Sequence, residues 1–315
     1  MAEKAIIIGS RESPLAVLQA RQVMNLLEKA HPHIETTLRT FKTKGDLFLD
    51  KGLGQLGDKG LFVKELEENL LLKNIDIAVH SAKDMPSELP VGLVMQSVGE
   101  REDPRDVVIT RLNEHFADLP RNAVVGTASA RRVAQLKRMR PELDYKIIRG
   151  NLQTRYNRLM EARGEYSAII LAAAGVHRLQ WHDKITEYLE PTVDHIPAVG
   201  QGILAVEYRK DDTQAANLLA KVHHAPTETA LQAERTVLKK LEGGCSIPLG
   251  VYAWHDSSMN LYRMKAMLLS MDGKECVTSQ RSFQTSKAKS AALDLAEELL
   301  AEGGKDILKT IRRFS

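Results

Sequence analysis

Residues capable of chemistry follow five short apolar runs in the sequence. The runs are "AIII" (5–8), "IDIAV" (75–79), "AVVG" (123–126), "YKII" (145–148) and "SAIILA" (167–172), and each is typical of a buried strand. Ligands of open α/β sheets bind beyond the carboxyl ends of the strands. The candidate ligand contacts are therefore the residues after each run: Arg11 and Ser13; Ser81, Lys83 and Asp84; Thr127, Ser129, Arg131 and Arg132; Arg149 and Arg155; and Arg178.

The recurring side chain at these positions is arginine, whose planar fork binds carboxylate or phosphate bidentately. Any single surface arginine is ordinarily just solvated. Cations after all five runs instead predict one site for a ligand with several negative groups. Asp84 is the one carboxylate that we find among them. This combination favours a small polyacid that also needs a carboxylate from the protein.

A second candidate is Cys245, which lies in the glycine-containing loop "LEGGCSIPLG". Glycines allow unusual backbone angles and close approach. A single cysteine in such a loop indicates a nucleophile or a point of covalent attachment. The alternative is a small buried hydrophobe, which is usual for cysteine and suits Cys276 in "KECVTSQ" better.

Other motifs are weaker. "GLGQLG" (52–57) has the spacing of a dinucleotide-binding loop, but a polar stretch precedes it where a strand is required. We interpret 42–60, which includes Lys59, as a mobile loop that could cover the site. The paired histidines at 31/33 and 223/224 lack a third ligand nearby, so we expect no metal. For His80 we expect a hydrogen-bonded structural role.

The elements that position these residues alternate between strand and helix, which predicts parallel sheets flanked by helices. Ser13 and Pro14 open a helix to about Lys29. After about residue 222 the pattern changes to a helix (227–241), three strand-like segments with an Asp272-Gly273 turn, and another helix from near Ser286. The segments "GEREDPRD" and "HIPAVGQG" are candidate crossings between domains.

Composition limits the class of protein. The chain has 315 residues, 43% of them hydrophobic and 27% charged, with a net charge of +3. Aromatic residues make up only 5%, which is poor for a surface that stacks nucleic-acid bases. With two cysteines and no long apolar run, we expect a reduced, cytoplasmic protein without a membrane segment.

Seven motifs, in order, resemble those of the hydroxymethylbilane synthase family, also called the porphobilinogen deaminase family. They are "GSRESPLAVLQ", "KGLFVKELE", "HSAKDMP", "GTASARR", "RGNLQTR", "PAVGQG" and "GGCSIPLG", and together they span the chain. The family often has threonine at the place of Ser10 and serine at that of Ala128. Neither departure touches the acid or the cysteine.

The resemblance implies an α/β fold with two periplasmic-binding-protein-like (type II) lobes and a small α+β C-terminal domain. The implied domains are residues 1–100 with 200–220, residues 104–196, and residues 223–315. It further implies a monomer that joins four porphobilinogen molecules, with loss of ammonia, on a covalent dipyrromethane primer. The linear tetrapyrrole is then released by hydrolysis.

The resemblance also assigns roles to the candidate residues. Asp84 matches the catalytic carboxylate, and Cys245 matches the residue in thioether linkage to dipyrromethane. Cofactor contacts are implied for Ser13, Ser81, Lys83, Asp84, Thr127, Ser129, Arg131, Arg132 and Arg155. Substrate contacts are implied for Arg11, Arg149, Arg155 and Arg178, and Lys59 falls in the covering loop.

Two other classes stay open on the sequence. One is a polyanion-binding module without chemistry, similar to a periplasmic binding protein. The other is an RNA-binding protein that uses 131–158, where nine Lys and Arg stand against two Asp and Glu. Salt-dependent RNA binding without turnover of porphobilinogen would favour the second.

Overall fold

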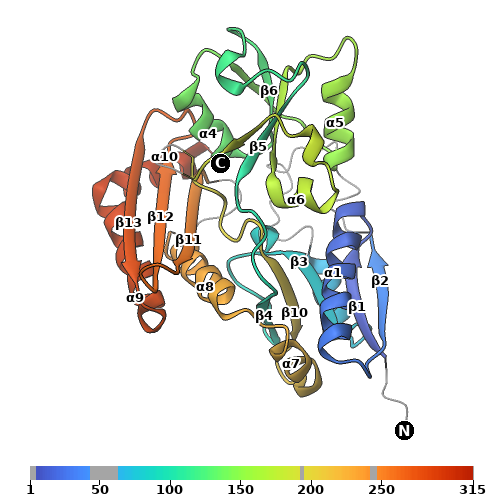
Figure 1. The fold of residues 1–315 in the computed structure, drawn as a ribbon. Helices are drawn as coiled ribbons and strands as arrows, with labels where there is room; N and C mark the ends of the chain where they lie inside the picture. The colour runs from blue at the N-terminus through green and yellow to red at the C-terminus, as the bar shows by residue number, and fades with distance from the viewer. Residues whose placement is uncertain (1–4, 43–62, 192–194, 242–246, 315) are drawn as a thin grey trace. The chain divides into compact units, whose positions relative to one another are not determined.

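The computed structural model describes residues 5–42, 63–191, 195–241 and 247–314. These residues form two compact units, one comprising 1–102 with 203–231 and the other 103–202 with 232–315. Figure 1 labels the helices and strands. The units are described one at a time.

The first unit is built on a five-stranded mixed sheet with the order β2-β1-β3-β10-β4. Strands β1, β2 and β3 are mutually parallel, whereas β10 runs antiparallel to both neighbours. The strands are β1 (Ile6–Arg11), β2 (Thr36–Phe41), β3 (Ile77–Ser81), β4 (Leu93–Val98) and β10 (Leu204–Arg209). The helices are α1 (Pro14–Ala30), α3 (Lys64–Leu71), α7 (Thr213–Ala220) and the start of α8 (Ala225–Lys240).

Alternation along the strands decides which helix covers which face of this sheet. Ile6 and Ile8 of β1 pack in one core with residues of α1 and α7, such as Val23 and Leu219. Ile7 points the other way and packs against a core that contains residues of α3. Successive side chains of a strand lie on opposite faces, so the sheet is covered on both sides.

The second unit contains a sheet of the same topology, with the order β7-β6-β8-β5-β9. Here β7, β6 and β8 are parallel and β5 runs antiparallel to β8 and β9. Helix α4 covers one face and helices α5 and α6 cover the other. The bounds are β5 (Asp106–Thr110), β6 (Val124–Gly126), β7 (Asp144–Lys146), β8 (Ala168–Ala172), β9 (Glu187–Leu189), α4 (Ala130–Met139), α5 (Leu152–Met160) and α6 (Ala173–Arg178).

The rest of this unit is an antiparallel sheet with helices. Strands β11 (Leu249–Asp256), β12 (Leu261–Leu269) and β13 (Cys276–Phe283) pair in sequence order. The expected turn between β12 and β13 is present, and Gly273 adopts a φ of +77° there. Helices α9 (Ala288–Leu299) and α10 (Lys305–Phe314) follow, separated by the kink at 300–304.

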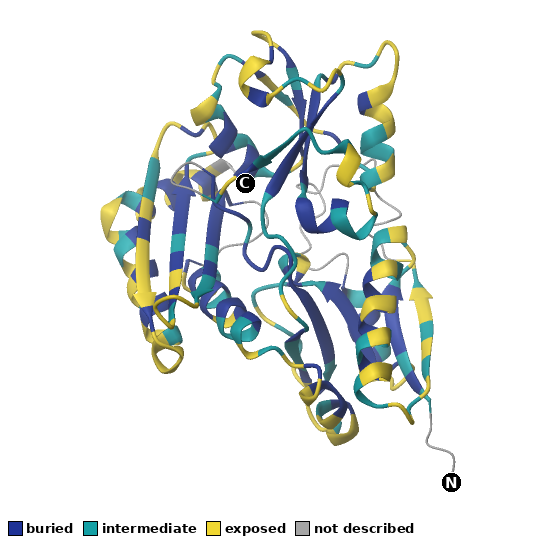
Figure 2. Cartoon of the chain, viewed as in Figure 1, coloured by how far each residue is buried: buried dark blue, intermediate teal, exposed yellow. Residues whose placement is uncertain are grey.

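The expected α/β class, with two type II lobes and an α+β part, is confirmed by these three sheets. The expectation of parallel sheets is confirmed for three strands of each five-stranded sheet, but both sheets are mixed because β10 and β5 run antiparallel. Two strands also differ in extent from their apolar runs. β1 continues to Arg11, whereas β7 covers Asp144–Lys146 and leaves Ile147, which is 63% exposed, outside the strand. Figure 2 shows buried residues concentrated in the strands of both five-stranded sheets.

Candidate functional site

In the first unit, two parallel strands deliver candidate residues to one edge of the sheet. Ile8 of β1 is paired with Ile77 of β3, so the carboxyl ends of both strands lie at the same edge. β1 ends at Arg11, and Ser13 caps α1 by accepting a hydrogen bond from the backbone N–H of Ala16 at 3.4 Å. The predicted helix start is confirmed, with proline as its first residue.

The turn after β3 holds Asp84 outward. Residues 82–84 form one turn of 3₁₀ helix, in which Ala82 is buried and the Asp84 side chain is exposed. The backbone N–H of Ala82 donates to the carbonyl of Ile203 at 3.0 Å, and Met85 is buried on the other side of Asp84. The preceding Ser81 accepts a hydrogen bond from the Gln19 amide at 2.8 Å. The backbone of this turn is therefore fixed while its carboxylate meets solvent.

Behind this turn lies a buried cluster of titratable groups. The imidazole Nε2 of His80 is 3.0 Å from Glu207 Oε2, and both side chains are almost fully buried. Neither atom forms a hydrogen bond within the described residues, so this contact does not confirm the hydrogen-bonded structural role expected for His80. Glu67 is also buried, and its pKa is raised to about 7 by desolvation and then by the charge of Glu207, with His80 opposing both.

In the second unit, the three parallel strands β7, β6 and β8 bring their carboxyl ends together. Ser129 caps α4 by accepting from the N–H of Arg132 at 3.4 Å, and Asn151 caps α5 by accepting from the N–H of Thr154 at 2.9 Å. The predicted site residues that follow these strands, or lie in the first turns of α4 and α5, are Thr127, Ser129, Arg131, Arg132, Arg149 and Arg155. Arg178 is the last residue of α6.

Two of these arginines are half-buried and held by backbone carbonyls. Arg155 Nε donates to the carbonyl of Gly150 at 2.8 Å, and Arg178 Nη2 donates to that of Gly202 at 3.1 Å. Arg149 is likewise half-buried. Such backbone contacts help to orient a guanidinium.

Arg131 and Arg132 lie deeper than the sequence suggested, with only 4% and 6% of their surfaces exposed. Arg131 Nη2 donates to Asp106 Oδ2 at 2.8 Å, and Arg132 Nη2 donates to Asp106 Oδ1 at 2.7 Å. The interpretation of Asp84 as the one carboxylate among the cations is therefore wrong. Asp106 begins the antiparallel strand β5, which the apolar runs did not reveal.

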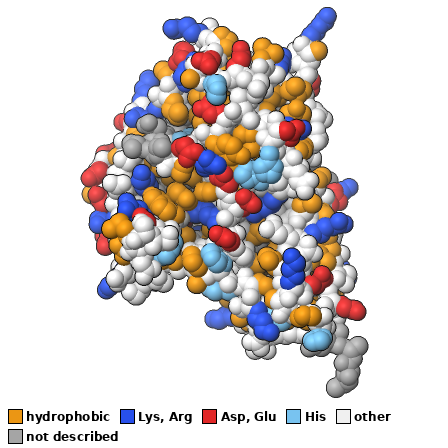
Figure 3. Space-filling view, in the orientation of Figure 1, with side chains coloured by type: hydrophobic (Ala, Val, Ile, Leu, Met, Phe, Trp, Pro, Cys, Tyr) orange, Lys and Arg blue, Asp and Glu red, His pale blue; other side chains and the backbone are white. Residues whose placement is uncertain are grey.

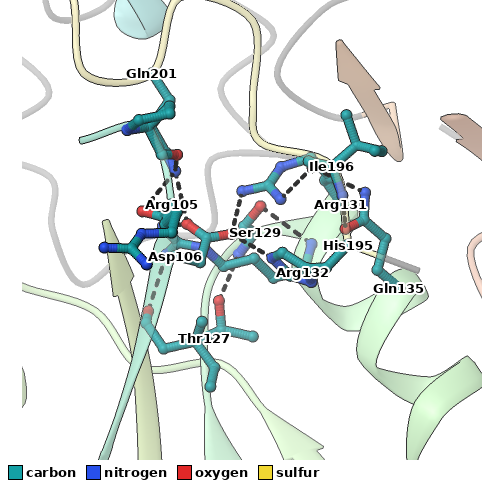
Figure 4. A network of polar contacts seen from close by, with 12 residues as sticks. Arg105, Asp106, Thr127, Ser129, Arg131, Arg132, Gln135, His195, Ile196 and Gln201 are labelled. Atoms are coloured by element: carbon teal, nitrogen blue, oxygen red, sulfur yellow. Dashed lines mark hydrogen bonds and ion pairs between the residues drawn. The ribbon is translucent and has the colours of Figure 1, made fainter. Parts of the chain in front are cut away.

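Two neutral side chains complete the contacts of Asp106. His195 Nε2 lies 2.7 Å from Oδ2, and Gln201 Nε2 donates to Oδ1 at 2.8 Å. Burial by itself would raise the pKa of Asp106, but the charges of both arginines and the contact with His195 hold that pKa well below its ordinary value. Figure 4 shows the side chains converging on Asp106.

Sequence reasoning missed Asp106, His195 and Gln201 as members of the site. They lie in "GEREDPRD" and "HIPAVGQG", which we read only as candidate crossings between domains. A charged residue next to an apolar run ("DVVIT") was the one available signal for Asp106. Nothing in the sequence marked its pairing with arginines 25 and 26 residues away.

The donor set of this cluster suits a ligand that carries carboxylates. The Nε atoms of Arg131 and Arg132 are buried and have no hydrogen-bond partner among the described residues. A buried donor without a partner is costly, whereas a carboxylate in contact with it gains a charge-assisted hydrogen bond. The arginines therefore fit an acidic cofactor such as dipyrromethane.

Some predicted site residues lie outside the described part of the chain. These are Cys245, Lys59 and the loop segment 43–60. Cys276 is half-buried and packs against a cluster that includes Ala134, Ile196 and Met267. That environment agrees with its interpretation as a small hydrophobe.

The molecular surface shows mixed charge. On the face drawn in Figure 3, basic and acidic side chains are interspersed. None of the helices in the described ranges is long and apolar enough to span a membrane.

Comparison with known proteins gives two family matches. Residues 6–217 match the family model described as "Porphobilinogen deaminase, dipyromethane cofactor binding domain". Residues 229–301 match the one described as "Porphobilinogen deaminase, C-terminal domain". The first match alone covers more than half of the chain.

Curated relatives are similar over the full length. The porphobilinogen deaminase of Carboxydothermus hydrogenoformans is 46% identical over 311 residues, which are 99% of this chain and 98% of that protein. The porphobilinogen deaminase of Syntrophobacter fumaroxidans is 42% identical over 99% of this chain and all of that protein. Among solved structures, the methionine-binding protein MetQ is 12% identical with a TM-score of 0.42, covering 74% of this chain and 90% of that one.

Proposed function

The chain belongs to the porphobilinogen deaminase family, and from this premise we propose how its residues perform the reaction. It is a transferase of tetrapyrrole biosynthesis with a dipyrromethane cofactor. It joins four porphobilinogen molecules head to tail into hydroxymethylbilane and releases ammonia. When bound, dipyrromethane supplies the primer to which the first unit is added.

The observation that carries the catalytic proposal is the exposed carboxylate of Asp84 on a fixed turn, with Lys83 beside it. Loss of ammonia from porphobilinogen leaves a cation that the pyrrole ring delocalises. A carboxylate facing the pyrrole N–H stabilises that charge and can exchange protons during formation of the new C–C bond. Asp84 is thus the proposed catalytic residue, and Lys83 binds an acid group of the cofactor.

The arginines are proposed to bind the negatively charged carboxylates of the ligand. Each porphobilinogen brings an acetate and a propionate, so carboxylates accumulate as the chain grows. An ion buried without a partner costs several kcal/mol. We assign cofactor carboxylates to Arg131, Arg132 and Arg155, and substrate carboxylates to Arg11, Arg149, Arg155 and Arg178. The hydroxyl groups of Ser13, Ser81, Thr127 and Ser129 supply further donors.

Cys245 is the proposed attachment point for the cofactor. Its support is the loop "GGCSIP" and the match of the family model for the cofactor-binding domain. A thioether needs only an accessible thiolate and an electrophilic carbon. Lys59 is proposed to belong to a segment that covers the ligand.

Assignments of domains, assembly, location and partners complete the proposal. We propose three domains (1–100 with 200–220, 104–196 and 223–315), a monomer, a cytoplasmic location and no nucleic-acid partner. Size-exclusion chromatography with light scattering tests the monomer. A dimer at micromolar concentration would contradict it.

The reaction itself is tested by incubating purified protein with porphobilinogen. We expect ammonia to be released in a four-to-one ratio to a linear tetrapyrrole. Absence of ammonia release, combined with RNA binding that weakens as salt rises, would favour the RNA-binding alternative instead.

A further inference from the structure

We propose that Asp106, His195 and Gln201 are positioning residues that orient the guanidinium groups of Arg131 and Arg132 for a carboxylate of the cofactor. This inference rests on the proposed function, because the cofactor is what brings the carboxylate. The side chains concerned all belong to the second unit and are drawn in Figure 4.

The carboxylate oxygens of Asp106 have their hydrogen-bond acceptor sites filled by neighbouring side chains. An ionised carboxylate has about four lone-pair sites. Oδ1 accepts from Arg132 at 2.7 Å and from Gln201 at 2.8 Å, while Oδ2 accepts from Arg131 at 2.8 Å and contacts His195 at 2.7 Å. Each oxygen therefore meets one cation and one neutral side chain.

Each of the two arginines, Arg131 and Arg132, is anchored at two nitrogens. Besides Asp106, Arg131 Nη1 donates to the carbonyl of Ile196 at 2.8 Å, and Arg132 Nη1 donates to that of Ile170 at 2.9 Å. Two anchors on different nitrogens fix the plane of a rigid guanidinium. The Nε–H direction of each arginine is thereby fixed as well.

The cluster of Asp106, Arg131 and Arg132 lacks one negative charge and two hydrogen-bond acceptors. Two guanidinium cations stand against one carboxylate, which leaves one surplus positive charge in a buried place. Within the part of the chain that the structure describes, the Nε atoms of Arg131 and Arg132 are buried without a hydrogen-bond partner. A ligand carboxylate would supply both the missing charge and the missing acceptors.

His195 is only 2% exposed and acts here as a neutral side chain. An ionised Asp106 can only accept, so Nε2 of His195 carries the hydrogen and donates. Burial lowers the pKa of His195, although its contact with Asp106 opposes the shift. A neutral donor completes the carboxylate without adding a further positive charge. The role of His195 is thus to hold Asp106, which in turn holds the arginines.

The test compares three variants by intact-protein mass. Apo-protein is loaded with porphobilinogen, and the rate of appearance of the dipyrromethane adduct is followed. His195→Phe removes the donor and should slow loading about ten-fold, the effect of losing one hydrogen bond to a charged group. His195→Gln places an amide N–H at the same reach and should restore loading to within about two-fold of wild type. His115→Phe, at an exposed histidine of the same unit, is the matched control.

Two results would overturn the inference: a His195→Phe protein that loads like wild type, or a folded His195→Gln protein that loads as slowly as His195→Phe. If His195→Phe does not fold, His195→Asn takes its place, since its shorter amide does not reach Asp106. Gln201→Leu, which removes the donor at Oδ1, should slow loading similarly. A wild-type protein that never gains an adduct would instead contradict the proposed function.

Discussion

Single residues in this molecule are specialised by how far they are buried. Asp84 and Asp106 are both carboxylates near the carboxyl edge of a sheet, yet one is exposed and the other is fully buried. The acceptors of the buried one are filled by Arg131, Arg132, His195 and Gln201, so it cannot serve a ligand. The exposed one keeps its acceptors for a substrate, which is why catalysis is assigned to it.

Asp84→Asn keeps the size of the side chain but removes its charge and its basicity. General acid–base catalysis contributes about 10²–10⁴-fold, so single-turnover ammonia release should fall at least about 100-fold. Asp84→Glu keeps the charge on a longer arm and should retain more activity than the asparagine variant. Release at the wild-type rate by Asp84→Asn would move the chemistry to another group, with Lys83 the next candidate.

Arg132 illustrates a residue whose charge serves the fold as well as the ligand. Replacing it with leucine leaves Asp106 with one arginine and the carbonyl of Ile170 without its donor. Asp106 keeps its pair with Arg131, so the expected cost is that of losing a buried hydrogen bond to a charged group, about 1.5–3 kcal/mol. Urea denaturation should show a loss of that size for Arg132→Leu, and less than about 0.5 kcal/mol for the exposed Arg158→Leu. Equal stability of the two variants would mean that the buried pair contributes nothing to the fold.

At the scale of elements, the sheets position the site through their strand order. In both five-stranded sheets the three parallel strands end at the edge that carries the candidate residues, and an antiparallel strand completes the sheet. β3, β10 and α3 also enclose the acid cluster of Glu67, His80 and Glu207. The stability of this packing should therefore depend on pH through the protonation of Glu67.

The raised pKa of Glu67 determines whether stability rises or falls with pH. Its pKa is about 7 in the folded chain against an ordinary value of 4.5, so the folded state keeps a proton that the unfolded state loses in this range. Its contribution to the free energy of unfolding should fall as pH rises from about 4.5 to about 7, and then level off. Urea denaturation at several pH values should show Glu67→Gln gaining stability relative to wild type over that interval. A constant difference between the two proteins would contradict the shifted pKa.

At the scale of the whole molecule, the sequence supported the general fold and most of the strand-end residues. Local signals sufficed where the chain specifies its own structure, as in the Ser13-Pro14 helix start and the apolar run before His80. They failed where structure depends on distant pairing. β10 joins the first sheet from more than 100 residues away, and Asp106 meets its arginines only through tertiary contact.

Replacing each of the two cysteines tests where the cofactor is attached. Cys276→Ser should leave the cofactor and most activity in place, because this half-buried side chain packs with apolar neighbours. Cys245→Ser should lose both, because it removes the proposed sulfur of the thioether. Activity assays and intact mass on the two variants check this. An adduct that persists in Cys245→Ser would refute the assignment.

The most direct test of the central claim is the intact mass of freshly purified wild-type protein. We expect a mass above that of the 315-residue chain by one dipyrromethane. Peptide mapping should place the addition on Cys245. An unmodified mass in protein that turns over porphobilinogen, or an addition located on Cys276, would rule out covalent attachment of the cofactor to Cys245.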